Sequence, residues 1–480
     1  MAVIAIAIML RIALASIHAV SGDACWQLSN AGFIAESKKL PLFEQFGRDE
    51  PFWAPPLFHL ISAFFYSLFS SFSSGIAEFA IKMVSPILGS LALIIFYKIS
   101  RMLFDEKISF YSLLFMAFIP LHIDYSVFSY ADSTVTFLAV LSVYFALKNK
   151  IILSSIASGL AILTKYNGIF ILPVLLYIVY TSNKGKEPAK KLIIFSIISL
   201  SIGSVWFIRN WIYLGNPVWP FMNSVFKGVE YGTFAESEVG KINIANIFSL
   251  SGIAVFYLGI FGVPDGNIAT LSFVKVPYFQ LFFAIWLLST FVFLIPFIFG
   301  VFSKMKHKKM LSIWILSYIV LTLLYILNAS WSVSRFMLPA FPAIALIWAQ
   351  GLNKIKFKGQ FLVALIILIA VGFIFTSILK ISIAAREWNF YMEDFEWAKD
   401  NTKKESIFIS GSQCVSYHIG RQTISQKIIN LEKADYAFVN QNFRLDNRAK
   451  IESDLLLEIK KRGNIIYSNE KTKTEIYKIG

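Results

Sequence analysis

Acidic and basic residues stand at one end of several long apolar segments of this 480-residue chain. A charge is costly in hydrocarbon unless it pairs with an opposite charge or lines a water-filled cavity. A carboxylate can act as a general base, and fixed cations can stabilise negative charge that develops on a leaving phosphate. The residues in this position are Asp23, Asp49, Glu50, Asp124, Asp132, Lys165, Arg209, Asn210 and Arg335. Segment ends can be polar without any function, but contributions from separate segments to one face favour a shared site.

The stretch from Ser21 to Leu60 contains the first of these residues. It opens with SGDACWQ directly after the first apolar segment and ends in WAPPLFHL, where two prolines begin a second apolar segment. We expect a polar loop between them. His59 would lie on the polar face of the proline-initiated helix, either contacting a ligand or simply preferring an interface. Glu50 would either join the site or be a solvated loop charge.

The composition indicates a polytopic membrane protein. Hydrophobic residues make up 57% of the chain and charged residues 15%, whereas soluble proteins have about 25% charged residues. The first twenty residues are apolar without a cleavage signature, which predicts an uncleaved first span.

Eleven apolar segments predict about 11 transmembrane helices, each near the ~20 residues needed to cross the hydrocarbon. They are residues 1–20, 76–100, 108–123, 131–147, 151–164, 168–182, 192–210, 278–302, 310–327, 336–352 and 361–380. Lys and Arg concentrate in every second connection, at 98–107, 148–150, 184–191, 304–309 and 354–358. The positive-inside rule places these short connections and the N-terminus in the cytoplasm. Much of the net charge of +15 therefore reports topology, and we expect no nucleic-acid partner.

This orientation requires that residues 54–73 do not span the membrane. Leu57, Leu60, Ile61, Phe64 and Leu68 follow helical spacing, with His59, Ser62 and Tyr66 on the other face. A helix with one apolar and one polar face is typical of the membrane interface. The alternative is a spanning helix whose polar face packs on a neighbour.

Two domains follow from the change in composition after residue 385. Residues 1–385 form the membrane part, with a first external loop at 21–75 and a long external loop at 211–277 whose short apolar stretch at 252–263 would be interfacial or re-entrant. Residues 386–480 predict a small extracytoplasmic α/β domain, with helices at 393–401 and 455–462. Its strands are expected at 406–410, 436–440, 464–468 and 474–479.

The two cysteines, Cys25 and Cys414, are far apart in the sequence. They define neither a disulfide framework nor a metal site. We expect Cys25 to be incidental.

Six motifs occur in order at the ends of the predicted spans: GD at 22–23, PPLFHL at 55–60, FSYADS at 128–133, LTKYNG at 163–168, RNWIYLGNPVWP at 209–220 and SRFMLPAFP at 334–342. With these motifs the membrane part resembles the GT-C class of membrane glycosyltransferases. The similarity is greatest to the family 39-like branch of protein O-mannosyltransferases and aminoarabinose transferases, which use a polyprenyl-phosphate sugar.

The resemblance implies a glycosyltransferase of the GT-C fold. Its donor would be a sugar on dolichyl or undecaprenyl phosphate, and its acceptor a hydroxyl of a glycan, lipid or protein on the outer face. Asp23 would be the general base, and the transfer would invert the configuration at the anomeric carbon. Lys165, Arg335 and Arg209 would stabilise the leaving phosphate. Asp132 would orient the acceptor or a metal, and Asp124 competes for that role.

Departures from the related enzymes narrow this expectation. Ala24 follows Asp23 where protein O-mannosyltransferases have a second acid, which disfavours protein O-mannosylation. Residues 386–480 contain no WWD motif of the oligosaccharyltransferases. Use of a divalent metal, Mg²⁺ or Mn²⁺ held by Asp23 and Asp132, is left undecided.

Two other functions compete with glycosyl transfer. A transporter or flippase of lipid-linked substrates would also have many spans and buried charges, but transporters favour broken helices near the midplane and internal repeats. A non-catalytic envelope-assembly protein would not need Asp23. The one-sided charges and the external domain favour an enzyme in the cell membrane.

Overall fold

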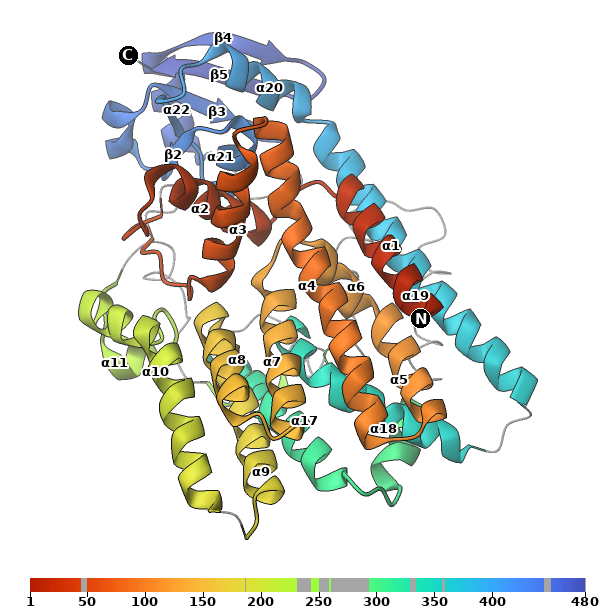
Figure 1. Cartoon of the computed structure of the whole chain (residues 1–480). Helices are drawn as coiled ribbons and strands as arrows, with labels where there is room; N and C mark the ends of the chain where they lie inside the picture. Colours follow the sequence, from red (N-terminus) through yellow and green to blue (C-terminus); the bar gives the residue numbers. More distant parts are fainter. Residues whose placement is uncertain are drawn as a thin grey trace.

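The structure is a computed structural model that describes residues 1–44, 50–185, 187–230, 243–249, 259, 293–328, 334–355, 359–443 and 450–479, with the backbone alone at 359–369. A bundle of helices forms most of the molecule, and a small sheet-containing domain sits at one end of it (Figure 1). The predicted fold class, a helical chain with several long apolar helices and a C-terminal α/β domain, is confirmed.

The bundle helices are α1 (Ala2–Ile17), α4 (Ser74–Leu103), α5 (Glu106–Phe118), α6 (Pro120–Val127), α7 (Ala131–Leu147), α8 (Ile151–Thr164), α9 (Leu172–Ser182), α10 (Pro188–Leu214), α17 (Lys308–Asn328), α18 (Phe341–Lys354) and α19 (Gly359–Asn389). The 3-10 helix η1 (Tyr166–Ile171) joins α8 to α9, and a second one, η2 (Ser334–Ala340), directly precedes α18. Beside them lie α11 (Asn223–Phe226), α13 (Ala245–Phe248) and a helix at Phe293–Phe302.

Length and hydropathy identify four described stretches that can cross a membrane: α4, α10, Lys308–Leu327 of α17, and the continuous Ser334–Lys354 stretch of η2 and α18. A fifth is added if α5 and α6 count as one bent span. The other apolar helices are shorter, at 10–17 residues. The number of about 11 spans therefore stays a prediction. Of the predicted span at 278–302, only residues 293–302 lie within the described part of the chain. Of the apolar stretch at 252–263, only Gly259 does.

Peripheral and central helices differ in what they expose. On α10, Ile197, Val205 and Ile208 are more than half exposed, as expected of a surface that faces lipid. On α18, Phe341 and Trp348 are buried, so this helix lies in the core of the bundle. The same apolar composition therefore serves lipid contact at the edge and packing at the centre.

One predicted span is interrupted, which corrects the expectation of a continuous helix there. Pro120 lacks a backbone N–H and holds Ile119 extended, so the segment 108–123 bends by 53° between α5 and α6. A second break, in the connection expected between the spans 151–164 and 168–182, lies at Lys165, which is extended with φ −161° and ψ 144° between α8 and η1. Both breaks lie next to charged residues that the sequence singled out.

A polar loop was the expectation for the stretch after the first span. The first part of this stretch is instead a helix, α2 (Asp23–Ser37). A second helix, α3 (Leu57–Phe69), follows it. On α3 the polar face with His59 and Ser62 is buried against the protein, while Leu60 and Phe64 are exposed. The end of α1 and the start of α4 lie at the same end of the bundle (Figure 1), the arrangement expected if residues 54–73 do not span.

The C-terminal domain contains the predicted helices α20 (Met392–Asn401) and α22 (Ser453–Arg462). Within the described residues, five strands form one mixed sheet in the order β2-β1-β3-β5-β4. They are β1 (Ile407–Ile409), β2 (Gln422–Ile424), β3 (Tyr436–Val439), β4 (Gly463–Asn469) and β5 (Thr474–Ile479). The helix α21 (Gln413–Ile419) and the strand β2 were not predicted, because both are short and lack a clear periodicity.

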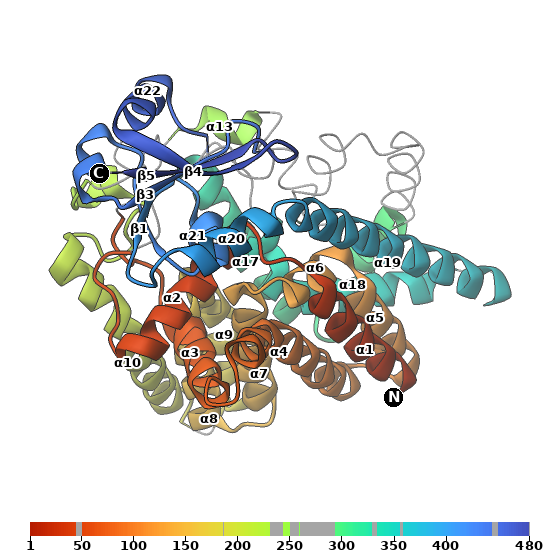
Figure 2. The same cartoon turned by 90° about the horizontal axis from the view of Figure 1, so that it is seen from above.

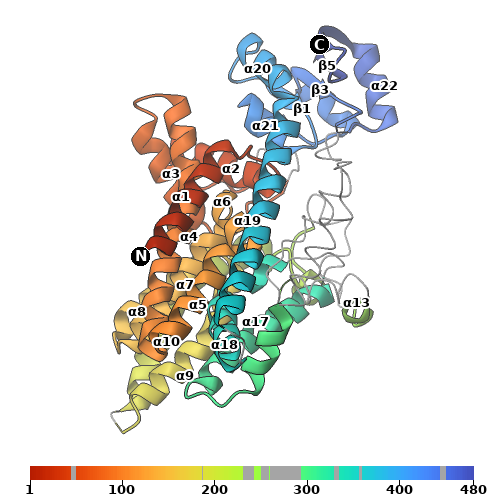
Figure 3. The same ribbon diagram turned by 90° about the vertical axis from the view of Figure 1, so that its right-hand side faces the viewer.

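A continuous helix connects the two parts of the molecule. Helix α19 runs from the far end of the bundle up to α20, past the predicted boundary at residue 385 (Figure 3). Seen from above, α21 lies beside α2, and α20 packs on α21 (Figure 2). The C-terminal domain is therefore held against the segment that follows α1.

The prediction that the cysteines are unrelated is wrong. Cys25 of α2 and Cys414 of α21 form a disulfide, with their Cα atoms 5.0 Å apart across 389 residues of sequence. Their separation in the sequence gave no sign of this, because only the docking of α21 on α2 brings them together. The Gln413 side chain also donates to the Gly22 carbonyl at 2.8 Å. Burial lowers the pKa of His418 to about 4, so its neutral ring donates from Nε2 to the Val20 carbonyl at 3.0 Å.

Replacing either cysteine tests this contact. Cys25→Ser, Cys414→Ser and the double variant should each lower the free energy of unfolding of the C-terminal domain by about 2–4 kcal/mol, because each removes the same cross-link. Chemical denaturation in detergent, followed by tryptophan fluorescence, measures these losses. A double variant whose loss equals the sum of the two single losses would contradict the bond.

Candidate active site

Asp23 is fixed in place as the first residue of α2. Gly22 before it has φ +59°, a conformation that favours glycine, and a Cβ at this position would lie 3.2 Å from the Tyr130 hydroxyl. The backbone N–H of Asp23 donates to that same hydroxyl at 3.1 Å. Its carboxylate lies at a helix N-terminus, where the helix dipole favours a negative charge.

The Asp23 carboxylate meets a cation that arrives 312 residues later. Arg335 Nη2 donates to Asp23 Oδ2 at 2.9 Å. The guanidinium also lies over the rings of Tyr130 and Tyr125, with its carbon 5.0 and 5.9 Å from their centroids. Arg335 is held in η2, directly before the buried helix α18, so its position is set by the core of the bundle.

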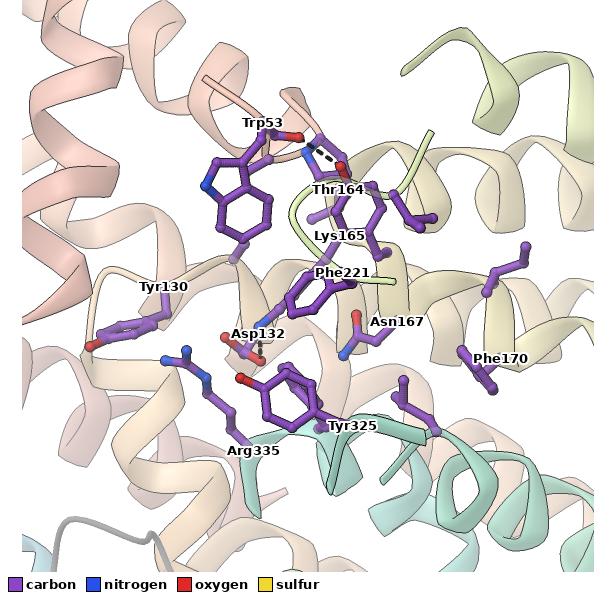
Figure 4. Close-up of a pocket in the computed structure, with 18 of the residues that line it drawn as sticks. Trp53, Tyr130, Asp132, Thr164, Lys165, Asn167, Phe170, Phe221, Tyr325 and Arg335 are labelled. Carbon is purple, nitrogen blue, oxygen red and sulfur yellow. Dashed lines mark hydrogen bonds and ion pairs between the residues drawn. The ribbon is translucent and has the colours of Figure 1, made fainter. Parts of the chain in front are cut away.

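A second pair joins α7 to the break after α8. Lys165 Nζ donates to Asp132 Oδ1 at 2.6 Å (Figure 4). Asp132 is buried in the first turn of α7, and its Oδ2 atom has no hydrogen-bond partner within the described residues. The Lys165 ammonium also lies 4.9 Å from the centroid of the Phe336 ring, and Phe336 is the residue that follows Arg335 in the sequence. A Cβ on Gly168 would collide with the Ala161 carbonyl at 2.3 Å, so the turn of LTKYNG requires glycine there.

Both ion pairs line one cavity of about 630 Å³. Its polar lining contains Asp23, Asp132, Lys165 and Arg335, and His59 lines it as well. One apolar part of the wall comes from η1, α10, the chain after α10, α17 and η2. Its members are Ile169, Phe170, Phe207, Val218, Phe221, Met222, Leu321, Leu324, Tyr325, Leu327 and Phe336. A cavity with charges and a long apolar wall suits a ligand with a polar head and an apolar chain.

Arg209 and Asp124 lie outside this lining. Arg209 donates to the Phe52 carbonyl at 2.7 Å and stacks over Trp206, and with Asn210 it holds the loop before α3. Asp124 is fully buried and accepts from Lys380 of α19 at 2.9 Å. Glu50 is also buried and does not line the cavity, and Asp49 lies outside the described residues.

Several residues around the cavity were missed in the sequence. Tyr130 supports both Asp23 and Arg335, and its position in the FSYADS motif was the available signal. Asn167 follows Lys165 within the LTKYNG motif and lines the cavity. Lys380 and Gln413 carried no signal, because single polar residues in an apolar or mixed segment show no partner until the chain folds.

The donor set at the cavity is a poor match for a metal cage. The carboxylates of Asp23 and Asp132 each carry a cationic side chain, and the described residues include no group of three or more His, Cys, Asp or Glu side chains arranged to hold an ion. Mg²⁺ and Mn²⁺ prefer several oxygen ligands. We therefore derive no step through a metal.

Comparison with known proteins supports the resemblance seen in the motifs. The family described as dolichyl-phosphate-mannose-protein mannosyltransferase matches residues 53–208, which include Asp132 and Lys165. The comparison with curated protein sequences gives no match.

Solved structures share the fold over nearly the whole chain. ArnT from Cupriavidus metallidurans bound to undecaprenyl phosphate has a TM-score of 0.62 at 12% identity, covering 99% of this chain and 97% of that one. The archaeal oligosaccharyltransferase AglB from Archaeoglobus fulgidus, in complex with an inhibitory peptide and a dolichol-phosphate, has a TM-score of 0.52 at 14% identity, covering 100% and 74%. The arabinofuranosyltransferase AftD from Mycobacteria has a TM-score of 0.51 at 11% identity, covering 99% and 41%. The predicted resemblance to GT-C glycosyltransferases is confirmed, and at these identities the structural likeness establishes the fold.

The Asp124–Lys380 pair provides a test of charge pairing away from the cavity. Asp124→Asn should cost about 3–5 kcal/mol of stability, because it leaves the Lys380 ammonium buried without its counter-charge. Asp124→Asn combined with Lys380→Met should recover part of the loss. Thermal unfolding in detergent compares the variants, and a double variant less stable than Asp124→Asn alone would contradict the pairing.

Proposed function

We propose that the protein transfers a sugar from a polyprenyl-phosphate donor to an acceptor hydroxyl at the outer face of the membrane. The observation that carries this proposal is the pairing of two carboxylates with two cations in a cavity that also has a long apolar wall. The cations suit the donor phosphate, and the apolar wall suits the first isoprene units. The acceptor is a hydroxyl of a glycan, a lipid or a protein.

In the proposed reaction Asp23 acts as the general base. It takes the proton of the acceptor hydroxyl while the acceptor oxygen forms a bond to the anomeric carbon. The bond from that carbon to the phosphate oxygen breaks, and its electron pair leaves with the polyprenyl phosphate. Attack from the face opposite the phosphate inverts the anomeric configuration.

Arg335 and Lys165 would stabilise the charge that grows on the leaving phosphate. Fixed cations contribute most when they lie in a site shielded from water. Arg335 pairs with Asp23 at 2.9 Å, so the guanidinium occupies the carboxylate. A donor phosphate that takes over the guanidinium would free Asp23 to accept a proton, so donor binding would activate the base.

Asp132 and Lys165 would work as a unit beside the reacting carbon. The 2.6 Å contact fixes the ammonium at the break between α8 and η1. The second oxygen of Asp132 is then available to orient the acceptor. Arg209 has a supporting role in this proposal, because it holds the loop that carries Trp53.

The distribution of charge supports the proposed orientation in the membrane. The short Lys- and Arg-rich connections between α4 and α5, α7 and α8, and α9 and α10 lie at the end of the bundle away from the C-terminal domain (Figure 1). The positive-inside rule supports a cytoplasmic location for that end. The C-terminal domain and the cavity beneath it would then be extracytoplasmic, as would a lipid-linked donor in the outer leaflet.

The structural relatives agree with this choice of donor. ArnT was solved with undecaprenyl phosphate and AglB with a dolichol-phosphate. Both ligands combine a phosphate with a polyprenyl chain, and the cavity lining here combines charged and apolar residues.

Replacing Asp23 tests the proposed base. Asp23→Asn should reduce transfer from a polyprenyl-phosphate sugar in membranes by at least about 100-fold, because the amide cannot accept the proton. Glu36→Gln is the matched control, since Glu36 is an exposed carboxylate on the same helix whose partner, Lys404, lies in the C-terminal domain. Equal transfer by Asp23→Asn and wild type would contradict the assignment. Movement of lipid or solute across the bilayer without any transfer would favour a transporter.

Chelation tests the role of metal. Transfer should persist in EDTA, because Lys165 and Arg335 already supply the positive charge that a metal would bring to the phosphate. The measurement is the initial rate after dialysis against EDTA, with Mg²⁺ or Mn²⁺ added back. A rate that falls on chelation and returns with either ion would show that a metal is required.

A further inference from the structure

Uncharged polar side chains on the cavity wall are not accounted for by the charged pairs. His59 is 1% exposed and Asn167 is 3% exposed, and both line the cavity. Neither ring nitrogen of His59 and neither amide atom of Asn167 has a hydrogen-bond partner within the part of the chain that the structure describes. Buried polar groups are nearly always paired, so a bound group that offers hydroxyls would satisfy them.

Flat aromatic faces surround these groups. Trp26 and Trp53 both line the cavity and stack with 6.2 Å between ring centroids, while Trp26 meets the His59 ring edge-on at 5.2 Å. Trp53 also stacks on Tyr166 at 6.0 Å. A sugar ring offers C–H groups to an aromatic face and hydroxyls to neutral donors and acceptors around its rim, so this combination suits a carbohydrate.

The uncharged wall adjoins both ion pairs. Trp26 lies three residues after Asp23 on α2, on the same side of the helix. Asn167 lies two residues after Lys165, and the Trp53 ring and the Asn167 amide flank the Asp132–Lys165 pair (Figure 4). A ring held on this wall would therefore lie next to the groups proposed to handle the phosphate and the proton.

We propose that Trp26, Trp53, His59 and Asn167 form a subsite for an uncharged sugar ring. This inference rests on the proposed function and names the class of substrate: a neutral hexose or pentose, rather than an amino sugar or a uronic acid. Within the described residues, no carboxylate near the subsite is without a partner: Glu44 accepts the Trp26 indole N–H and does not line the cavity, while Asp23 and Asp132 are paired with Arg335 and Lys165. His59 is 1% exposed, and burial favours its neutral ring, which offers one donor and one acceptor.

The ring can come from two sources that share this chemistry, the glycosyl group of the donor or a sugar of the acceptor. The test compares the binding of four probes to the full-length protein in nanodiscs: undecaprenyl phosphate, undecaprenyl phosphate glucose, undecaprenyl phosphate carrying an amino sugar, and free methyl glucoside. The variants are His59→Phe and Asn167→Leu, which keep size and remove hydrogen bonding. Asn183→Leu is the control, because Asn183 is a buried asparagine at the α9–α10 turn, far from the cavity.

In the wild type and in Asn183→Leu, glucose on the lipid should strengthen binding relative to bare undecaprenyl phosphate, and the amino sugar should strengthen it less. His59→Phe and Asn167→Leu should each remove about 5- to 10-fold of that gain, the worth of one or two hydrogen bonds, without changing the affinity for the bare lipid. This result assigns the ring to the donor. Loss of methyl glucoside binding in the two variants, with no glucose-dependent gain on the lipid, assigns it to the acceptor.

Two results would overturn the subsite: the same glucose-dependent gain in both variants as in wild type, or no binding of either glucoside form. A larger gain for the amino sugar than for glucose would overturn its preference for a neutral ring. Failure of the bare lipid to bind would instead count against the proposed function, and the methyl glucoside comparison would still decide whether the subsite exists.

Discussion

Charge pairing across distant segments is the constraint on which this structure depends. Three carboxylates of the bundle, Asp23, Asp124 and Asp132, each meet a cation that the sequence places far away or behind a break in a helix. Asp124 and Asp132 are buried, where the desolvation of an unpaired charge costs several kcal/mol, so their pairs fix the relative position of the segments that carry them. Asp23 is half exposed, and its pair holds α2 to η2. The pairs of Asp23 and Asp132 line the cavity and are the ones proposed to take part in chemistry. The pair of Asp124 with Lys380 lies outside the cavity lining and holds α6 to α19.

The site is built where the helices are interrupted. Lys165 lies at the extended residue between α8 and η1, and Asp23 follows a glycine in the left-handed conformation. Arg335 lies in a 3-10 helix before α18. A regular helix satisfies its own backbone and points side chains at neighbouring helices, whereas a break lets side chains from several segments converge on one space. The interruptions thus provide the convergence that the proposed reaction needs.

The C-terminal domain participates in this arrangement. Through Cys414, Gln413 and His418 it holds residues 20–25, the short segment that places Asp23. Trp388 and Phe395 pack in the same cluster as Val20, Ala24 and Cys25. A domain whose own sequence says little about chemistry therefore contributes to the position of the proposed base.

The sequence by itself determined the class of protein and half of the site. Apolar length, the positions of Lys and Arg, and the ordered motifs predicted the helical membrane part and the C-terminal α/β domain. They also singled out Asp23, Asp132, Lys165 and Arg335, which the structure places around one cavity. These features are local, since hydropathy and motif can be read within one segment.

Only the tertiary structure decided the partners. In the structure Asp23 pairs with Arg335 and Asp132 with Lys165, whereas Asp124 and Arg209 lie outside the cavity lining. The polar face of α3 is buried against the protein, and Cys25 forms a disulfide with Cys414. The physical reason is that an ion pair, a disulfide or a buried face is a relation between two segments. No single stretch of this sequence contains both of them.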